Sequence, residues 1–333
     1  MNGGVKTPVP SVFNRFKMTL LAVENLYKHF PINGGLFLRK IAQASVINGI
    51  SLAVERGEIL GIVGESGCGK STLARLIMRI LEPTNGTIQF AGLPAGSYSR
   101  KNYYHRVQMV FQDPFSSLNP KMTVDAILTE MIRLHQPEAD LVKTRATLLD
   151  EVGLPQSAGR KYPHEFSGGQ RQRIAIARAL GADPILLIAD EPVSALDVSI
   201  QAQILNLLNN LQEHRNLSLV FISHDLEIID YFCDRILVMY LGKIVEELAE
   251  NALHTNAQHP YTQALLHSMP HPDKRETGLK ILKGELPSPL DLPKGCSFYS
   301  RCAVRKEMCE RQTPELIENF PSHKVACWDV HEG

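Results

Sequence analysis

Residues 64–71, GESGCGKS, have the types and spacing of a phosphate-binding loop, or P-loop. They fit the pattern G-x-x-x-x-G-K-[ST], and the apolar run before them and the helical pattern after them supply the context that it requires. Such glycines let backbone N–H groups point at phosphate oxygens, beside the positive end of the helix dipole. A glycine-rich turn without a ligand is the simpler alternative. The residues predicted to contact a nucleotide are Gly64, Glu65, Ser66, Gly67, Cys68, Gly69, Lys70, Ser71 and Thr72.

Metal binding and water activation are assigned to side chains on this loop and on a second apolar run, ILLIA, that ends in Asp190 and Glu191. We expect Lys70 to reach the β- and γ-phosphates and Ser71 to ligate Mg²⁺. Ligands of α/β sheets bind at the C-terminal ends of strands, so Asp190 is expected to hold Mg²⁺ through water. Glu191 is expected to act as general base on the attacking water. Without the P-loop upstream, the acidic pair would be an ordinary strand end.

Two further motifs narrow the class of P-loop protein. FSGGQRQR starts a helix with Ser167, Gly168, Gly169 and Gln170, which makes a second anion-binding helix N-terminus. The alternative is a simple helix cap, since serine before glycines is a favourable helix start. His224 follows a third apolar run, LVFIS, where a γ-phosphate sensor belongs. A structural histidine at a strand end is the alternative there.

The elements that would position these residues alternate between apolar strands and helices. Strands are predicted at residues 59–63, 87–90, 106–111, 185–189 and 219–223, with short strands before residue 60 and a hairpin near residues 235–246. Helices are predicted at about residues 71–80, 124–152, 167–180, 200–214 and 226–232. Fully apolar strands alternating with helices indicate a sheet covered on both faces, hence an α/β domain.

The length, composition and charge of the chain exclude some classes of protein. The chain has 333 residues, 44% of them apolar, with 35 basic and 35 acidic side chains. Zero net charge argues against a protein that coats nucleic acid. The apolar runs are far shorter than the roughly 18 residues of a membrane span, and residues 1–18 lack the apolar core of a signal peptide, so we expect a cytoplasmic chain. The length suggests about two domains.

Changes in composition and in hydrophobic periodicity along the chain indicate where its domains begin and end. Residues 1–18 read as a flexible tail and residues 19–250 as the α/β domain. After about residue 250, proline, histidine and cysteine become frequent and long periodic runs disappear, so residues 251–333 are expected to form a small C-terminal lobe.

The order of GESGCGKS, VFQDP, SGGQ, IADEP, SALD and ISHD resembles the nucleotide-binding subunits of ABC transporters. The resemblance implies an ABC-type P-loop ATPase with a mostly parallel core sheet, a β subdomain and a helical signature subdomain. It implies that Gln112 touches Mg²⁺ or water and connects to a membrane subunit, that residues 194–197 cross a dimer interface, and that His224 is the switch histidine. Phe30 is similar to the aromatic residue that stacks on adenine, with Tyr27 as the second candidate.

In this family the signature helix of one chain caps the γ-phosphate held by the P-loop of another. One copy of each motif therefore supplies two half-sites, which predicts a dimer with two ATP molecules at its interface. Residues 167–170 would act on the partner's nucleotide, and Lys70, Ser71, Gln112, Asp190, Glu191 and His224 would act on the chain's own.

Three segments narrow the branch of the family: QDPFSSLNPKMTV, HPYTQALL and GELPSPLDLPKGCSFYSRC. They resemble the dipeptide, oligopeptide and nickel importer ATPases, and specifically the F-type ATPase subunit of a dipeptide permease. The resemblance implies a peripheral subunit on the cytoplasmic face of the bacterial inner membrane that powers peptide import by ATP hydrolysis. It implies a second, related ATPase subunit in a heterodimer, two transmembrane permease subunits and a periplasmic peptide-binding protein. Import of nickel chelates or antimicrobial peptides, and a soluble ABC ATPase outside transport, are the alternatives.

Four of the six cysteines lie near the C-terminus: Cys296, Cys302, Cys309 and Cys327. Structural zinc sites usually contain tight C-x₂₋₄-C pairs, which this spacing lacks. Four thiolates suit a [4Fe–4S] cluster, and the resemblance extends to importer ATPases that carry one. A structural [4Fe–4S] cluster, zinc and unliganded thiols all remain open.

Overall fold

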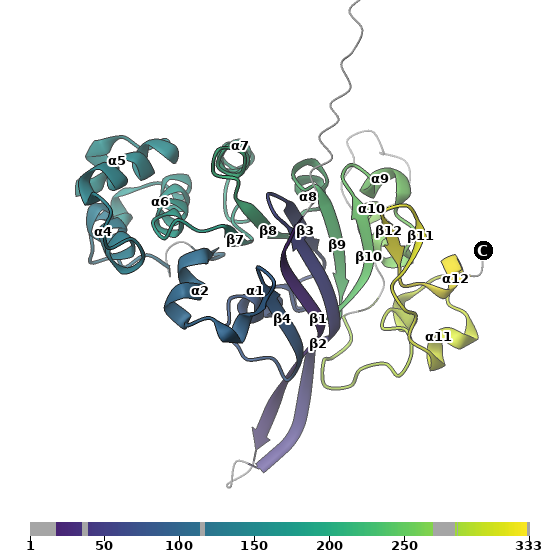
Figure 1. Cartoon of the computed structure of the whole chain (residues 1–333). Helices are drawn as coiled ribbons and strands as arrows, with labels where there is room; N and C mark the ends of the chain where they lie inside the picture. The colour runs from purple at the N-terminus through teal and green to yellow at the C-terminus, as the bar shows by residue number, and fades with distance from the viewer. Residues whose placement is uncertain (1–17, 35–38, 114–116, 269–283, 285, 332–333) are drawn as a thin grey trace, which may run out of the picture.

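The computed structural model describes residues 18–34, 39–113, 117–268, 284 and 286–331. The flexible tail predicted for residues 1–18 lies outside this part of the chain, apart from Met18. Two sheets form the centre of the molecule, a group of helices lies to one side and the C-terminal region to the other (Figure 1). Among the described helices, none combines the length and apolarity that a membrane crossing needs.

The larger sheet has eight strands in the order β11-β12-β10-β9-β3-β8-β7-β6. Strands β6, β7, β8, β3 and β9 are parallel, and every residue of β3, β7 and β8 is buried, which explains their unbroken apolar runs. The strand bounds are β3 (Ile59–Val63), β6 (Val107–Val110), β7 (Leu186–Asp190), β8 (Ser218–Ser223), β9 (Arg235–Tyr240), β10 (Lys243–Ala249), β11 (Ile317–Phe320) and β12 (His323–Val325). The predicted α/β class with a mostly parallel core sheet is confirmed.

The smaller sheet is antiparallel, with the order β2-β1-β4-β5. Its strands are β1 (Thr19–Gly34), β2 (Arg39–Glu55), β4 (Asn85–Phe90) and β5 (Leu93–Pro94). The short strands expected before residue 60 are two long ones, paired over almost their whole length with several register shifts. Apolar residues of this sheet, of β3 and of helix α1 (Lys70–Ile77) share one hydrophobic core. The smaller sheet therefore packs against β3 and α1.

Helices α4 (Val124–His135), α5 (Leu141–Glu151) and α6 (Gly168–Leu180) form the group on the left of Figure 1. The prediction of one helix over residues 124–152 was wrong: Pro137 lies in the break, and Asp140 caps α5 by accepting from the N–H groups of Val142 and Lys143. Elsewhere in the described part of the first 250 residues, α-helices are present at α2 (Arg100–Arg106), α7 (Val198–Arg215) and α8 (Leu226–Phe232).

The C-terminal region joins the core sheet. Its described α-helices are α9 (Leu253–Asn256), α10 (Pro260–Ser268), α11 (Glu307–Arg311) and α12 (Trp328–His331). Strand β12 pairs with β10, and a buried contact of 2.8 Å joins His323 Nε2 to Glu246 Oε1 beneath them. The edge of β10 is thereby covered, as sheet edges usually are in stable proteins. The last strands of the expected lobe thus extend the larger sheet.

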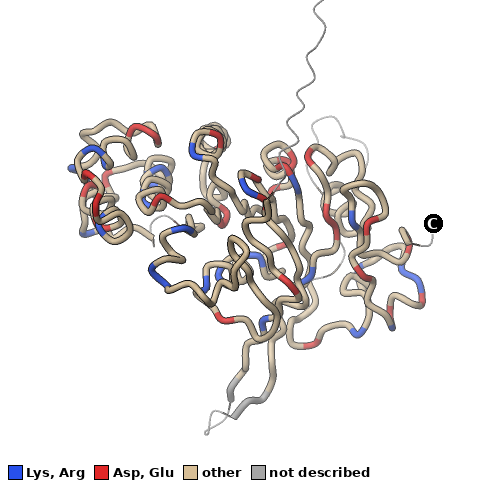
Figure 2. Tube along the Cα trace, viewed as in Figure 1, with Lys and Arg blue, Asp and Glu red and all other residues tan. Residues whose placement is uncertain are grey.

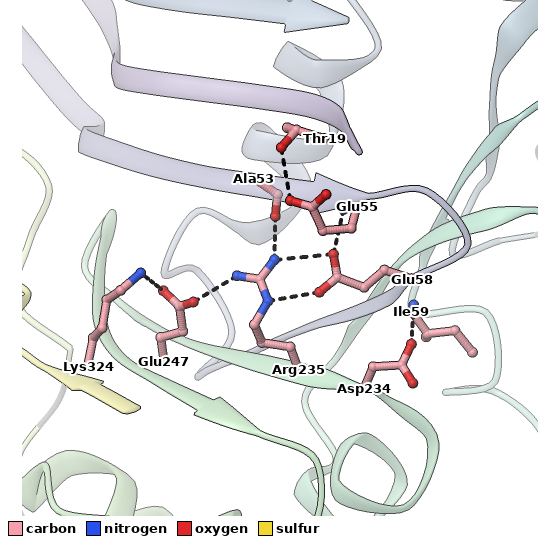
Figure 3. Close-up of polar contacts among 9 residues, drawn as sticks. All are labelled: Thr19, Ala53, Glu55, Glu58, Ile59, Asp234, Arg235, Glu247 and Lys324. Atoms are coloured by element: carbon pink, nitrogen blue, oxygen red, sulfur yellow. Dashed lines mark hydrogen bonds and ion pairs between the residues drawn. The ribbon is translucent and has the colours of Figure 1, made fainter. Parts of the chain in front are cut away.

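Basic and acidic residues are interspersed along the Cα trace (Figure 2). One cluster of ion pairs and hydrogen bonds links strands β2, β9, β10 and β12 (Figure 3). Arg235 Nε lies 2.8 Å from Glu58 Oε1, Arg235 Nη1 lies 2.8 Å from Glu247 Oε1, and Nη2 donates to the carbonyl of Ala53 at 2.5 Å. Lys324 on β12 donates to Glu247 at 3.1 Å. Because the Glu58 side chain is only 4% exposed, its negative charge depends on Arg235 for compensation.

We expect Arg235→Met to lower the free energy of unfolding by about 2 to 3 kcal/mol, because it leaves the buried carboxylate of Glu58 without its cation. Urea denaturation measures this loss. Arg311→Met removes an ion pair whose side chains are 73% and 78% exposed, and it should cost less than about 1 kcal/mol. Equal losses in the two variants would contradict the assigned importance of Arg235.

Candidate functional site

The P-loop, residues 64–71, connects β3 to α1. Two of its glycines are required by geometry. A Cβ on Gly64 would lie 2.1 Å from the carbonyl oxygen of Met239, and Gly69 caps α1 with a φ of 110°, in the left-handed region. The loop therefore takes its shape through backbone approaches that other residues do not allow.

Lys70 lies at the start of α1 and is 5% exposed. Its Nζ donates to the carbonyls of Gly64 at 2.6 Å and Glu65 at 3.0 Å, so the ammonium group is held against the loop. Cys68 is buried beside it, and burial raises the pKa of its thiol. Cys68 is thus a thiol that fills space, and Lys70 is the cationic group of the loop.

Two of the three residues predicted for Mg²⁺, Ser71 and Asp190, contact each other although they come from different elements, whereas the third, Gln112, contacts Glu191. Ser71 Oγ on α1 donates to Asp190 Oδ1 at the end of β7, at 3.1 Å. Asp190 is 4% exposed, and burial raises the pKa of its carboxyl, while the hydrogen bond from Ser71 acts in the opposite direction. A hydroxyl and a carboxylate are oxygen donors of the kind that Mg²⁺ prefers.

Glu191 contacts two other predicted site residues, Gln112 and His224. Its Oε2 accepts from Gln112 Nε2 at 3.0 Å and lies 3.2 Å from His224 Nδ1. Glu191 has a positive φ of 48°, and its N–H donates to the carbonyl of Ile222 at 2.9 Å. This unusual backbone conformation turns the side chain, which is 12% exposed, toward the same edge of the sheet as the P-loop.

The signature residues form the predicted helix start. Ser167 Oγ accepts from the N–H of Gln170, and Gln170 Oε1 accepts from the N–H of Ser167, which is a capping box. Gly169 is buried against Ile200, whereas Ser167, Gly168 and Gln170 are exposed. They lie in the group of helices to one side of the P-loop (Figure 1). The simple cap is therefore present, and contact with a nucleotide stays a prediction.

The adenine-stacking prediction falls on strand β1. Phe30 lies opposite Ala44 on β2, and Lys28 Nζ lies 5.1 Å from the centre of its ring. The hydroxyl of Tyr27 lies against Gly49. Residues 194–197 follow Glu191, where Ser194 Oγ donates to the Glu191 carbonyl at 3.1 Å and Asp197 precedes α7. The roles of Phe30 and of residues 194–197 stay predictions.

The four C-terminal cysteines line one cavity, together with aromatic residues that include Phe298 and Tyr299. Burial, with the neighbouring thiols adding to it, raises the pKa of Cys296 to about 11, so the neutral thiol is favoured there. Within the described residues no group of three or more His, Cys, Asp or Glu side chains is placed to hold a metal ion. The cysteines are brought together as predicted, without the arrangement of a metal centre.

Two residues beside the P-loop were missed by sequence reasoning. Arg301 pairs with the carboxylate of Glu65, and Tyr261 accepts from the Glu65 N–H at 2.9 Å. That N–H was expected to face phosphate and points instead at the C-terminal region. Both partners come from segments quoted above for their resemblance, but no local pattern connects them to a loop about 200 residues away.

The fold and the site define a P-loop ATPase cassette. The sequence profile of the ABC transporter family matches residues 47–194, and that of the oligopeptide/dipeptide transporter C-terminal region matches residues 245–309. The chain belongs to the ABC transporter family, in the branch whose ATPase subunits carry this C-terminal region, and it is an ABC-type ATPase subunit.

Relatives with known names support this placement. The chain is 51% identical to the oligopeptide transport ATP-binding protein AppF of Bacillus subtilis (strain 168), over 93% of this chain and 97% of the relative. It is 46% identical to a probable peptide ABC transporter ATP-binding protein, y4tS, of Sinorhizobium fredii, over 92% of this chain and 89% of the relative.

Solved structures agree on the fold. The cbiO1 protein of Clostridium perfringens, part of an ABC transporter complex, aligns with a TM-score of 0.60 and 29% identity, over 70% of this chain and 89% of that one. The ATP-binding cassette MJ0796, solved as a dimer bound to ADP and phosphate, aligns with a TM-score of 0.61 and 26% identity, over 69% and 98% of the two chains.

Asp190 should show opposite effects on stability and activity. Because burial raises its pKa, the folded chain binds the Asp190 proton more tightly than the unfolded chain does, and the ionised carboxylate costs folding free energy at neutral pH. We expect Asp190→Asn to raise the melting temperature at pH 7, with a gain that shrinks as the pH falls through the raised pKa. The same variant should lose Mg²⁺-dependent ATP turnover by at least about 100-fold.

Thermal melts across pH and steady-state ATPase assays measure the two effects. Asp150→Asn is the matched control, since Asp150 is exposed on α5 and should change neither property. A lower melting temperature for Asp190→Asn at pH 7 would contradict the assigned cost of burial.

Proposed function

We propose that this chain binds and hydrolyses MgATP to power the import of di- or oligopeptides as part of a multi-subunit ABC transporter. The observation that carries the proposal is the meeting of Gln112 and His224 on one oxygen of Glu191, beside the Ser71–Asp190 pair. The peptide cargo is inferred from the names of the relatives, which are oligopeptide and peptide transport ATP-binding proteins.

In this proposal each residue has one chemical task. Lys70 leaves its loop carbonyls to bind the β- and γ-phosphates, Ser71 would supply an oxygen ligand for Mg²⁺, and Asp190 would hold the ion through water. Glu191 takes a proton from the attacking water, and Gln112 and His224 hold its carboxylate in place until the γ-phosphate arrives. Phe30 stacks on the adenine.

The second half of the site would come from a partner ATPase. The N-terminus of α6, where Ser167, Gly168 and Gln170 are exposed, offers backbone N–H groups and a helix dipole to an anion outside this chain. A dimer with the partner's P-loop opposite this surface would use both, and the cassette MJ0796 was solved as a dimer bound to ADP and phosphate. The family resemblance favours a related but different ATPase subunit as the partner.

The transporter's other subunits would be two transmembrane permeases and a periplasmic peptide-binding protein, with this chain on the cytoplasmic face of the inner membrane. A surface pocket lies along α4 and reaches Arg145 of α5. Apolar residues such as Met122 and Leu134 line it together with the charged residues Asp125, Glu130, Arg133 and Arg145. It follows the Gln112 segment in the chain, and its mixture of apolar and charged side chains suits an amphipathic segment of a permease. Co-purification with membrane proteins, and not with nucleic acid or ribosomes, would separate this proposal from a non-transport ABC ATPase.

For the C-terminal cysteines we propose a structural [4Fe–4S] cluster. The support is that all four line one cavity, the number of thiolates that such a cluster takes. Binding requires the four thiols to lose their protons and to turn toward one point. Iron and acid-labile sulfide analysis of anaerobically purified protein decides the question: zinc alone, or no metal, would overturn the cluster.

Replacing the general base tests the ATPase mechanism. We expect Glu191→Gln to bind MgATP as the parent does, to lower turnover by at least about 100-fold, and to trap an ATP-bound dimer with the partner ATPase. Single-turnover assays and size-exclusion chromatography measure these effects. Glu227→Gln, an exposed change at the N-terminus of α8, should leave both unchanged. Parental turnover in Glu191→Gln would disprove the role of Glu191.

Uptake tests the transport function. A strain lacking this gene should lose uptake of labelled dipeptides and oligopeptides, regain it with the parent gene, and fail to regain it with Lys70→Ala. Labelled nickel chelates and antimicrobial peptides serve as competing cargoes in the same assay. Restored uptake with Lys70→Ala, or uptake of nickel chelates alone, would refute peptide import powered by this site.

A further inference from the structure

A partly buried ion pair connects the C-terminal region to the P-loop. Arg301 Nη1 lies 2.6 Å from Glu65 Oε2, and Nη2 lies 3.0 Å from Glu65 Oε1, so the guanidinium group grips both oxygens of the carboxylate. The Arg301 side chain is 4% exposed and that of Glu65 is 27% exposed. Bidentate pairs of this kind fix orientation as well as distance.

A second contact acts on the backbone of the same residue. The N–H of Glu65 donates to the hydroxyl of Tyr261 on α10 at 2.9 Å, and Tyr261 is completely buried. A Cβ added at Gly67 would lie 3.9 Å from Leu286, so the C-terminal region also contacts the tip of the loop. Glu65 is therefore held through its main chain and its side chain by residues far away in the sequence.

These contacts rest on a rigid aromatic cluster. The rings of Tyr240, Tyr261 and Phe298 lie 4.6 to 5.5 Å apart, and the Arg301 guanidinium lies 5.9 Å from the Tyr240 ring. Phe298 and the 3₁₀ turn Tyr299–Arg301 lie between Cys296 and Cys302, beside the cysteine cavity. Arg301 thus projects from a turn that is fixed by packing on one side and by the cysteine cavity on the other.

We propose that Arg301 and Tyr261 are positioning residues for ATP binding, through which the C-terminal region sets the shape and charge of the P-loop. This inference rests on the proposed ATPase function. The Glu65 carboxylate belongs to a loop that receives a triphosphate, and like charges at short range repel strongly where water is partly excluded. Arg301 neutralises that carboxylate and turns it toward the C-terminal region, and Tyr261 fixes the adjoining peptide group.

The proposal predicts a particular pattern in a double-mutant cycle. Arg301→Gln should weaken MgATP binding about tenfold, which corresponds to about 1.4 kcal/mol, because the Glu65 charge is left facing phosphate. Glu65→Gln removes that charge and should stay within about threefold of the parent, and the double variant Glu65→Gln/Arg301→Gln should recover to the same range. A role confined to stability predicts instead that the double variant binds as weakly as Arg301→Gln or more weakly.

The measurements are titration with a fluorescent ATP analogue, melting temperature, and steady-state turnover of the full chain. In Arg301→Gln, KM for ATP should rise while kcat at saturating ATP stays within about twofold, since no reacting group is lost. Arg301→Lys should regain part of the affinity. Tyr261→Phe, which keeps the ring, should raise KM in the same way. Arg305→Gln is the matched control, because Arg305 is exposed on the following segment, 5.3 Å from the Tyr299 ring.

The outcomes separate this inference from the function on which it rests. A parent protein that binds no MgATP would refute the proposed function. A parent that binds MgATP, with Arg301→Gln binding equally well or with a double variant as weak as Arg301→Gln, would refute only the positioning role.

Discussion

The register of three neighbouring parallel strands fixes the whole site. Val63 on β3 lies opposite Ser223 on β8, and Ile222 on β8 lies opposite Asp190 on β7. The residues that follow these strand ends leave the sheet at one edge: the P-loop, His224 and Glu191. A slip by one residue in either pairing would turn the side chains to the opposite face. Because every residue of these strands is buried in close-packed surroundings, such a slip would disrupt the packing on both faces of the sheet.

Two residues at this edge of the sheet, Asp190 and Glu191, cost folding free energy, which interactions elsewhere in the fold offset. Asp190 is ionised at neutral pH only against the effect of burial, and Glu191 has a left-handed backbone conformation that residues with side chains rarely adopt. The neutral overall composition conceals this local order. Paired clusters such as that of Arg235 and Glu58 join the strands that frame the site, so that strain at the catalytic edge is opposed by contacts at the other end of the sheet.

Sequence reasoning succeeded where chemistry depends on local spacing. The P-loop, the end of β7 and the start of α6 each combine a strand or a helix cap with the residues beside it, and periodicity reveals such units. It failed at residues 124–152, where leucine and isoleucine spacing continues through Pro137 although the helix does not. It also missed the contact between Glu65 and Arg301, which lie 236 positions apart and are brought together by the packing of the C-terminal region against the core. The roles of Phe30 and of residues 167–170 depend on a nucleotide or on another chain, and no single-chain pattern decides them.

The C-terminal region depends on the core as much as it supports it. His259 is buried among its aromatic residues, and desolvation lowers its pKa to about 3, so it packs as a neutral ring against Phe298. Strand β12 needs the edge of β10, and the turn that carries Arg301 needs the aromatic cluster above the P-loop. Coupling between two sites is reciprocal. If docking of the C-terminal region favours the P-loop conformation that binds ATP, then bound ATP favours the docked state by the same factor. Because the cysteine cavity adjoins the turn that carries Arg301, a change in that cavity would alter the affinity for ATP through the same coupling.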